Sequence, residues 1–154
     1  MTDTKHQHQH WMRRAIELAR ECPTAEGAYS VGAVIVDDQG AELATGYSRE
    51  TDPKVHAEEA ALAKLDANDP RLRTATIYST LEPCSERATK TRIPCTDLIL
   101  QAGIRTVVIA WREPSLFVDD CVGVEKLREH GLAVVELPEL ADEAMSMNRH
   151  LNLS

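Results

Sequence analysis

Aromatic residues and long apolar runs are both scarce in this sequence. Its 154 residues include two Trp, three Tyr and one Phe, which is little surface for stacking the bases of single-stranded nucleic acid. The longest apolar runs, such as residues 107–111, are far shorter than the roughly 20 residues that span a bilayer. Residues 1–10 contain no apolar core and do not resemble a secretory signal. We therefore predict a cytoplasmic protein that does not bind membranes.

Positive charge is also in short supply. The chain has 17 Lys and Arg against 25 Asp and Glu, which gives a net charge of −8. A negative mean field repels the phosphates of DNA, RNA and anionic lipids. Nucleic acid is therefore not an expected partner, and a small-molecule substrate is.

Cysteine is infrequent, with four residues, and disulfides are not needed for stability. A chain of this length buries roughly 68–70% of its unfolded surface in its own core. In a reducing compartment, cysteines more often bind metals or take part in catalysis. We predict a solvated, disordered leader over residues 1–9 and a single domain over residues 10–154. The alternating His6, His8 and His10 leave a metal-binding tract as the alternative for this leader.

Hydrophobic periodicity predicts helices alternating with short strands. The predicted helices cover 10–22, 56–65, 95–101, 122–130 and 139–150, and the predicted strands cover 31–36, 42–48, 74–80, 105–110 and 132–136. Strand, helix, strand with short joints predicts that the last two strands are parallel. The fold class is therefore α/β, a three-layer α/β/α sandwich around a five-stranded mixed sheet. The last helix either packs on the sheet or closes over the substrate, and its apolar spacing favours packing.

Three short segments carry most of the usable chemistry: His56-Ala57-Glu58, Pro83-Cys84 and Pro94-Cys95. Each lies at or near the start of a predicted helix, where the partial positive charge favours a thiolate and a neutral imidazole. Those are the forms that bind metals. One His and two Cys supply three ligands to Zn²⁺ and leave the fourth position to water, as in catalytic zinc sites. We predict one Zn²⁺ per chain, held by His56, Cys84 and Cys95.

A fourth cysteine ligand would change this interpretation. Cys22 and Cys121 are the candidates, although a small buried apolar role suits each of them better. With a fourth protein ligand, the chain would be a non-catalytic binding module stabilised by zinc.

Glu58 favours the catalytic interpretation. On the opening turn of its helix, its carboxylate can take a proton from a metal-activated water and pass it to a ring nitrogen and a leaving amine. This chemistry releases ammonia from an amidine-like ring carbon. The next residue, Glu59, is predicted to be a solvated helix position, because a step of about 100° turns it away from Glu58.

These residues resemble the signature of the zinc-dependent cytidine/deoxycytidylate deaminase superfamily, H-x-E followed by P-C-x-x-C. Here the second cysteine follows the first after ten intervening residues rather than two. With its flanking segments 80–85 and 94–99, this insertion is most similar to the deaminase domain of the riboflavin-biosynthesis deaminase–reductase. The resemblance implies that His56, Cys84 and Cys95 hold zinc, that Glu58 shuttles protons, and that the chain forms a homodimer or higher homo-oligomer.

The loops that would face the substrate depart from that domain. Residues 28–30 replace its usual Asn-Pro, and residues 86–92 replace its His-His-Gly-Arg-type loop. The centre is retained and the substrate-facing loops differ, so the same substrate does not follow. The candidate substrate contacts are Ser30, Ala57, Arg87, Arg92 and Phe117.

A basic cluster in the loop between the two zinc cysteines has two interpretations. Arg87, Lys90 and Arg92 could hold a substrate phosphate, since Arg offers a bidentate fork. Alternatively they form a solvated loop that balances nearby Glu82 and Glu86.

The leading functional hypothesis is a hydrolase that deaminates an amino-substituted pyrimidine or purine-type ring. The substrate is a free base, a nucleoside or a nucleotide, with an aminopyrimidine of riboflavin synthesis among the candidates. A tRNA or single-stranded DNA editing deaminase is the first alternative, and the negative net charge argues against it.

Overall fold

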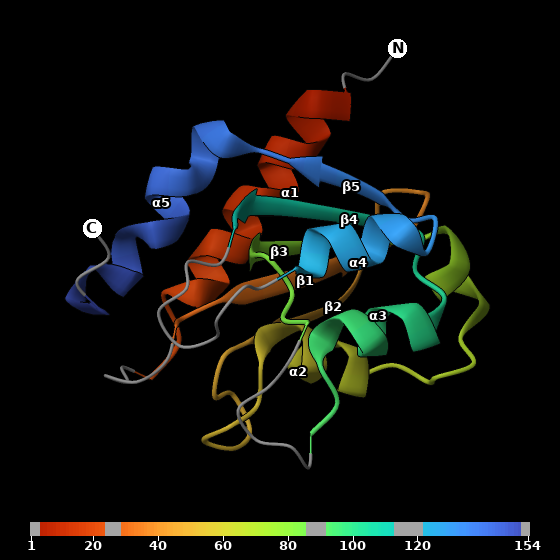
Figure 1. Cartoon of the computed structure of the whole chain (residues 1–154), viewed down its shortest axis with the longest axis horizontal. Helices are drawn as coiled ribbons and strands as arrows, with labels where there is room; N and C mark the ends of the chain where they lie inside the picture. The colour runs from red at the N-terminus through yellow and green to blue at the C-terminus, as the bar shows by residue number, and fades with distance from the viewer. Residues whose placement is uncertain (1–3, 24–28, 86–91, 113–121, 152–154) are drawn as a thin grey trace.

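A five-stranded sheet forms the centre of the protein, with helices on both sides (Figure 1). The computed structural model describes residues 4–23, 29–85, 92–112 and 122–151. The helical elements along the chain are α1 (Thr4–Ala19), α2 (Ala57–Ala63), η1 (Pro70–Thr74), α3 (Cys95–Ala102), α4 (Gly123–Glu129), η2 (Pro138–Leu140), α5 (Ala141–Met145) and η3 (Ser146–Leu151). The strands are β1 (Gly32–Val36), β2 (Glu42–Tyr47), β3 (Thr76–Leu81), β4 (Thr106–Trp111) and β5 (Ala133–Glu136).

The sheet is mixed, with strand order β2-β1-β3-β4-β5. Strand β1 pairs antiparallel with both β2 and β3. The pairs β3–β4 and β4–β5 are parallel, because α3 and α4 carry the chain back across one face between them. The parallel arrangement predicted for the last two strands is confirmed.

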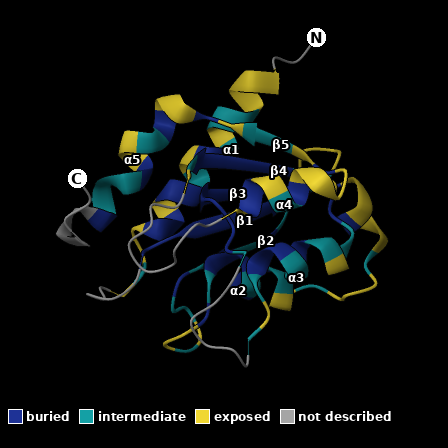
Figure 2. Cartoon of the chain, viewed as in Figure 1, coloured by how far each residue is buried: buried dark blue, intermediate teal, exposed yellow. Residues whose placement is uncertain are grey.

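Both faces of the sheet are covered, which explains why β1 and β4 read as continuous apolar runs. In β1, Ala33 and Ile35 pack into a core cluster with residues of α2, α3 and α4. The alternate residues Val34 and Val36 pack into a second cluster with α1 and the segment around α5. Figure 2 shows the central strands buried between the two helical layers. The predicted three-layer α/β/α sandwich is therefore confirmed.

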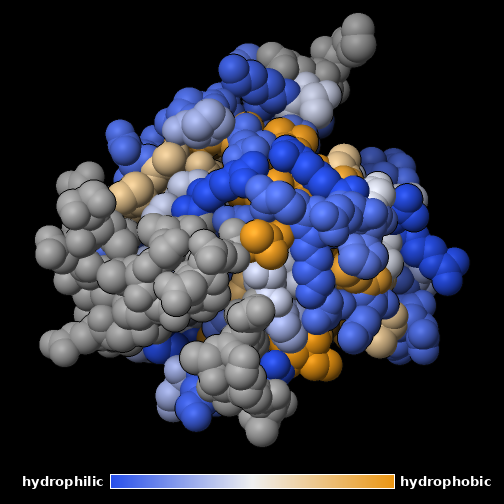
Figure 3. Space-filling model, in the orientation of Figure 1, coloured by the Kyte–Doolittle hydropathy of each residue, from blue (hydrophilic) through white to orange (hydrophobic). Residues whose placement is uncertain are grey.

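The outer surface agrees with the composition. Charged residues make up 27% of the chain, and hydrophilic side chains cover most of the described surface in the view of Figure 3. Within the described ranges, no helix combines the length and the apolar character needed to cross a lipid bilayer.

Helix α1 begins earlier than the sequence pattern predicts. Residues 4–9, assigned above to a disordered leader, are helical in the structure, so that prediction is wrong for them. Their contacts are with distant parts of the chain: His8 Nδ1 lies 2.7 Å from the hydroxyl of Tyr78, and Gln9 donates to Glu139. A polar segment can therefore be ordered by partners that its local sequence does not reveal.

The C-terminal segment is also different from the prediction. A single helix over residues 139–150 was expected, but the chain forms three short helical pieces, η2, α5 and η3. Leu140 and Ala144 are buried against α1 and the sheet, so this segment packs on the sheet as its apolar spacing indicates. The side chain of Asn148, in η3, binds the backbone of Ser30. Its amide oxygen accepts from the N–H of Ser30 at 2.6 Å, and its amide nitrogen donates to the carbonyl of Ser30 at 3.1 Å.

Gly46 sets the distance between β2 and α2. A Cβ at this position would overlap the carbonyl oxygen of Ala57 and lie 2.5 Å from the backbone nitrogen of Ala61. Both are rigid helix backbone atoms, so the helix would have to move. Since His56 immediately precedes this helix, the glycine also places that residue.

We expect Gly46→Ala to lower the free energy of unfolding by about 3 kcal/mol, because overpacking against backbone has no cheap relaxation. Urea unfolding followed by circular dichroism measures this, and the midpoint should fall by about 1–2 M. Thr45→Ala, in the same strand, is the matched control and should change the midpoint little. A Gly46→Ala midpoint equal to that of the control would show that the two elements separate easily.

Candidate zinc and catalytic site

Three side chains with metal-binding atoms meet where three segments of the chain converge. His56 is the residue before the first turn of α2, Cys84 follows the end of β3, and Cys95 opens α3. Among the described residues, these three form the one group of His, Cys, Asp and Glu side chains placed to hold a metal ion. The sequence-predicted ligand set is therefore brought together by the fold.

The donor atoms are spaced as a tetrahedral zinc ion requires. Nδ1 of His56 lies 3.6 Å from Sγ of Cys84 and 3.4 Å from Sγ of Cys95. Zinc bonds of about 2.3 Å to sulfur and 2.0–2.1 Å to nitrogen, at tetrahedral angles, put such a pair roughly 3.5 Å apart. All three donor atoms lie within 4.8 Å of one another. The residues present therefore fit Zn²⁺.

The surroundings favour the thiolate form of Cys84. A hydrogen bond with the Cys95 side chain lowers the pKa of the Cys84 thiol most, burial opposes this, and the His56 ring lowers it further. The backbone N–H of Cys95, on the opening turn of α3, donates to Cys84 Sγ at 3.2 Å. This donor neutralises part of the charge that a thiolate carries, which supports the ligand role of Cys84.

Glu58 is buried on the opening turn of α2. It is the second residue of α2, so it shares the opening turn with His56 rather than lying in the body of the helix. Its residue is 4% exposed. A residue this deeply buried is not part of a solvated helix face.

No fourth ligand joins this group among the described residues. Cys22 donates to the carbonyl of Val31 at 3.5 Å, and burial raises the pKa of its thiol, which keeps it protonated. Cys121 lies outside the described residues. The observed set of one His and two Cys is the composition of a catalytic zinc site with an open position.

The five predicted substrate contacts differ in what the structure describes. Ser30 and Ala57 are both buried, Ser30 near the start of β1 and Ala57 next to His56. Arg87 and Phe117 lie outside the described residues. Arg92 is described, and its guanidinium donates to the carboxylates of Asp52 and Glu59.

Tight packing supports the segment that carries Cys84. The carboxylate of Glu82 accepts from the backbone N–H of Val124 at 2.9 Å. A Cβ on Gly123 would overlap the carbonyl oxygen of Pro83, so only glycine allows α4 to approach this closely. Helix α4 is thereby attached to the residues that immediately precede the first cysteine ligand.

Sequence patterns alone did not assign these supporting residues. Glu59 was expected to be solvated, yet it accepts from the backbone N–H of His56 at 3.2 Å. A Glu at the third helix position facing back to the residue before the helix is a capping pattern, and that spacing was visible in the sequence. The links from Glu82 to Val124 and from Arg92 to Asp52 join residues about 40 apart, and no local pattern reports them.

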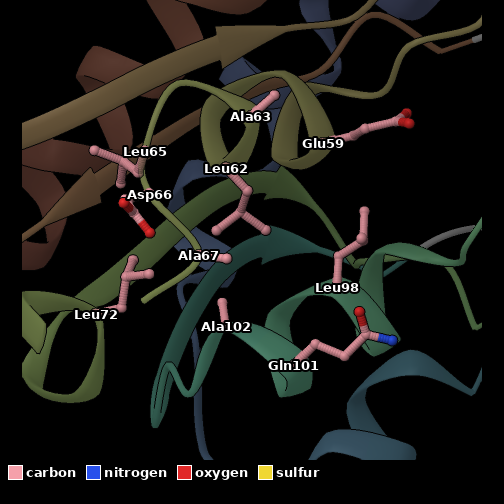
Figure 4. Close-up of a pocket in the computed structure, with 10 residues that line it drawn as sticks. All are labelled: Glu59, Leu62, Ala63, Leu65, Asp66, Ala67, Leu72, Leu98, Gln101 and Ala102. Atoms are coloured by element: carbon pink, nitrogen blue, oxygen red, sulfur yellow. The ribbon is translucent and has the colours of Figure 1, made fainter. Parts of the chain in front are cut away.

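A separate hollow lies between α2, η1 and α3. Its volume is about 350 Å³, and its lining is mainly apolar, with Leu62 of α2 and Leu98 of α3 among the side chains that line it (Figure 4). None of the three zinc ligands lines it. Glu59 borders it, but its carboxylate points away from the apolar side chains (Figure 4). The hollow is therefore distinct from the zinc site.

Comparisons with known proteins agree with this geometry. Residues 5–111 match the family described as the cytidine and deoxycytidylate deaminase zinc-binding region. The diaminohydroxyphosphoribosylamino-pyrimidine deaminase of Schizosaccharomyces pombe is 41% identical over 140 residues, which cover 90% of this chain and 34% of that protein. The riboflavin biosynthesis protein RibD of Aquifex aeolicus is 38% identical over 119 residues, covering 77% of this chain and 31% of that protein. The chain thus spans about a third of the length of these curated relatives.

Solved structures show the same fold. The diaminohydroxyphosphoribosylaminopyrimidine deaminase/reductase of Thermotoga maritima superposes with a TM-score of 0.76 at 37% identity, covering 94% of this chain and 40% of that one. The Rib2 deaminase of Aspergillus oryzae superposes with a TM-score of 0.75 at 23% identity, covering 91% and 89%. At 23% identity, the similarity to the A. oryzae deaminase supports a common fold and nothing further.

Proposed function

The chain belongs to the cytidine and deoxycytidylate deaminase family, and from this premise we propose that it is a zinc-dependent hydrolase that releases ammonia from an amino-substituted ring. The observation that carries the proposal is a buried carboxylate, Glu58, on the opening turn of the helix that follows His56, in a chain whose three metal-binding atoms are spaced for tetrahedral zinc. A protein that only stored or displayed zinc would have no need of a buried carboxylate at that point.

The residues of the site divide the chemistry between them. Bound zinc supplies a water nucleophile whose proton is acidic near neutral pH. His56, Cys84 and Cys95 hold the ion and leave one position open. Glu58 would take one proton from the attacking water and deliver it to the ring nitrogen. It would then take the second proton, from the hydroxyl now added to the ring carbon, and deliver it to the amine. The carbon–nitrogen bond breaks, ammonia leaves, and the ring carbon becomes a carbonyl.

An aminopyrimidine carrying a ribose phosphate is the substrate that we put first. The support comes from the names of two similar proteins, the S. pombe relative and the T. maritima enzyme. Both names describe a deaminase that acts on a phosphoribosylated aminopyrimidine. Ser30 and Ala57 are the proposed substrate contacts among the described residues, and Arg87 and Phe117 remain candidates outside them. The ion pairs of Arg92 favour another role for that residue, argued below.

An ammonia-release screen tests the activity. Purified chain loaded with one equivalent of zinc is offered cytosine, adenine, guanine, their nucleosides and nucleotides, and the aminated pyrimidine intermediates of riboflavin synthesis. We expect one compound, a phosphoribosylated aminopyrimidine, to release ammonia at least 100-fold faster than the others, because catalysis requires the ring to be held against Glu58. Ammonia is measured with a coupled dehydrogenase assay.

Three outcomes would contradict the proposal in different ways. Turnover of a nucleoside or a free base instead would keep the reaction class and change the substrate. Zinc binding without ammonia release from any compound would favour the non-catalytic module. A salt-sensitive gel shift with RNA or single-stranded DNA would instead support the editing alternative.

The remaining features of the proposal concern the whole molecule. We propose that residues 10–154 form a single domain, to which the helical residues 4–9 also belong. We further propose a cytoplasmic location and a homodimer or higher homo-oligomer. The first is supported by helices packing on both faces of one sheet, and the last by the resemblance alone. Sedimentation equilibrium of the zinc-loaded chain measures the oligomeric state.

A further inference from the structure

Arg92 joins three segments around the zinc ligands. Its Nη2 lies 2.8 Å from Oδ2 of Asp52, and its Nη1 lies 3.3 Å from each carboxylate oxygen of Glu59. Asp52 precedes His56 by four residues, and Arg92 precedes Cys95 by three. One guanidinium therefore connects the chain on both sides of His56 with the segment that leads into Cys95.

Glu59 links Arg92 directly to the zinc ligand His56. Its Oε1 accepts from the backbone N–H of His56 at 3.2 Å and also from Nη1 of Arg92. A single carboxylate oxygen thus contacts both the residue that bears the imidazole ligand and the arginine near Cys95. The carboxylate also lies on the first turn of α2, where the helix dipole stabilises negative charge.

The setting of this cluster distinguishes it from ordinary surface ion pairs. The side chains of Arg92 and Glu59 are 26% and 24% exposed, so solvent screens their attraction less than it does for fully exposed pairs. One guanidinium bonded to two carboxylates is a network rather than an isolated pair, the arrangement in which such contacts have measurable effects. Charge-assisted bonds of this kind restrict both position and orientation.

We propose that Arg92 and Glu59 are positioning residues that hold the His56 imidazole and the Cys95 thiolate at zinc-ligand distance. The proposal rests on the proposed function only in taking zinc as the bound ion. Arg92, on this view, is not a contact for a substrate phosphate. It keeps the segments at 52–59 and 92–95 together, so that the ligand triad is assembled before the ion binds.

The rate of zinc release tests the proposal without measuring activity. Full-length chain loaded with one zinc is mixed with excess chelator, and the release of the ion is followed with a zinc-sensitive dye. Arg92→Met removes the guanidinium with little loss of length. Glu59→Gln keeps an oxygen that can accept from His56 and removes the charge.

We expect each variant to release zinc about 10- to 100-fold faster than the parent chain. Replacing residues that orient metal ligands typically lowers metal affinity by that factor, and we expect the lost affinity to take the form of faster release. The double variant should be no faster than the quicker single one, because the two residues act as one unit. Arg92→Lys should recover part of the slow release, since it keeps the charge and loses the bidentate fork.

Lys64→Met is the matched control. Lys64 pairs with Glu50 at 2.7 Å and so also ties α2 to the loop that precedes it, but it contacts none of the zinc ligands in any described hydrogen bond. Its removal should leave zinc release unchanged. Circular dichroism before chelation confirms that each variant is folded.

Two results would overturn the proposal while leaving the proposed function intact. The first is zinc release within twofold of the parent in both Arg92→Met and Glu59→Gln. The second is unchanged zinc release in Arg92→Met together with lost binding of inorganic phosphate, which assigns Arg92 to phosphate recognition. A parent chain that binds no zinc contradicts the proposed function itself.

Discussion

Glu58→Gln is expected to lower the rate of ammonia release by at least about 100-fold while zinc remains bound. The amide has nearly the same shape as the carboxylate, so the buried space that Glu58 fills stays filled. It has no basic oxygen to accept the proton of water and no proton of suitable acidity to give to the leaving amine. General acid–base catalysis by one side chain contributes typically 10²–10⁴-fold, and here the same residue serves both halves of the reaction.

The measurement pairs steady-state ammonia release with zinc content by atomic absorption. Glu17→Gln, an exposed glutamate on α1, serves as the control and should retain full turnover. Retention of more than a tenth of the parent rate by Glu58→Gln would place the proton shuttle elsewhere. Loss of zinc from the variant would assign Glu58 to the support of the metal and not to proton transfer.

Cys95→Ser is expected to weaken zinc binding by roughly 60- to 700-fold and to abolish turnover at low zinc concentration. Binding free energies of about 10–16 kcal/mol for four-ligand zinc sites correspond to about 2.5–4 kcal/mol for each ligand. Every 1.4 kcal/mol is a factor of ten. The serine hydroxyl is a poor replacement because, unlike the thiolate, it keeps its proton near neutral pH.

The chain supplies its own control for this substitution. Cys22 is a cysteine outside the ligand group, bonded to the Val31 carbonyl, and Cys22→Ser should bind zinc as the parent does. Competition with a chelator of known affinity measures both variants. Tight zinc binding by Cys95→Ser, or its loss in Cys22→Ser, would mean that a different cysteine completes the site.

Much of the fold could be predicted because its cause is local. The run from Val31 to Val36 is apolar and rich in β-branched residues, as is typical of a strand covered on both faces, and the structure has β1 there. Gly103 ends α3 in the left-handed conformation, which the Ala102-Gly103 pair indicates. The last two strands are separated by one helix with short connections on each side. Such a connection predicts a parallel pair of strands with a right-handed crossover, and β4 and β5 are parallel.

The two ends of the chain could not be predicted in the same way. Residues 4–9 are polar, and nothing within them distinguishes a solvated leader from a helix. Their order comes from Tyr78 and Glu139, which are far away in the sequence. The segment after Pro138 has the apolar spacing of one helix, yet packing against α1 and the sheet divides it into shorter pieces.

By itself, the sequence determined which side chains form the ligand group for a metal ion, and it named the carboxylate proposed to work beside them. His56, Glu58, Cys84 and Cys95 stand out because metal binding and proton transfer demand particular functional groups, and because the sequence encodes helix starts at His56 and at Cys95. The opening turn of α2 then relates Glu58 to His56 with no help from the rest of the molecule.

Only the tertiary structure decided how those groups are held. The approach of α2 to β2 at Gly46, the attachment of α4 beside Cys84, and the links from Arg92 to Asp52 and Glu59 all join segments that lie far apart along the chain. Such contacts depend on how loops close and layers pack, which no short window of residues records. The sequence allowed Arg92 to face either solvent or a substrate phosphate. In the folded chain it pairs with the carboxylates of Asp52 and Glu59, close in sequence to the zinc ligand His56.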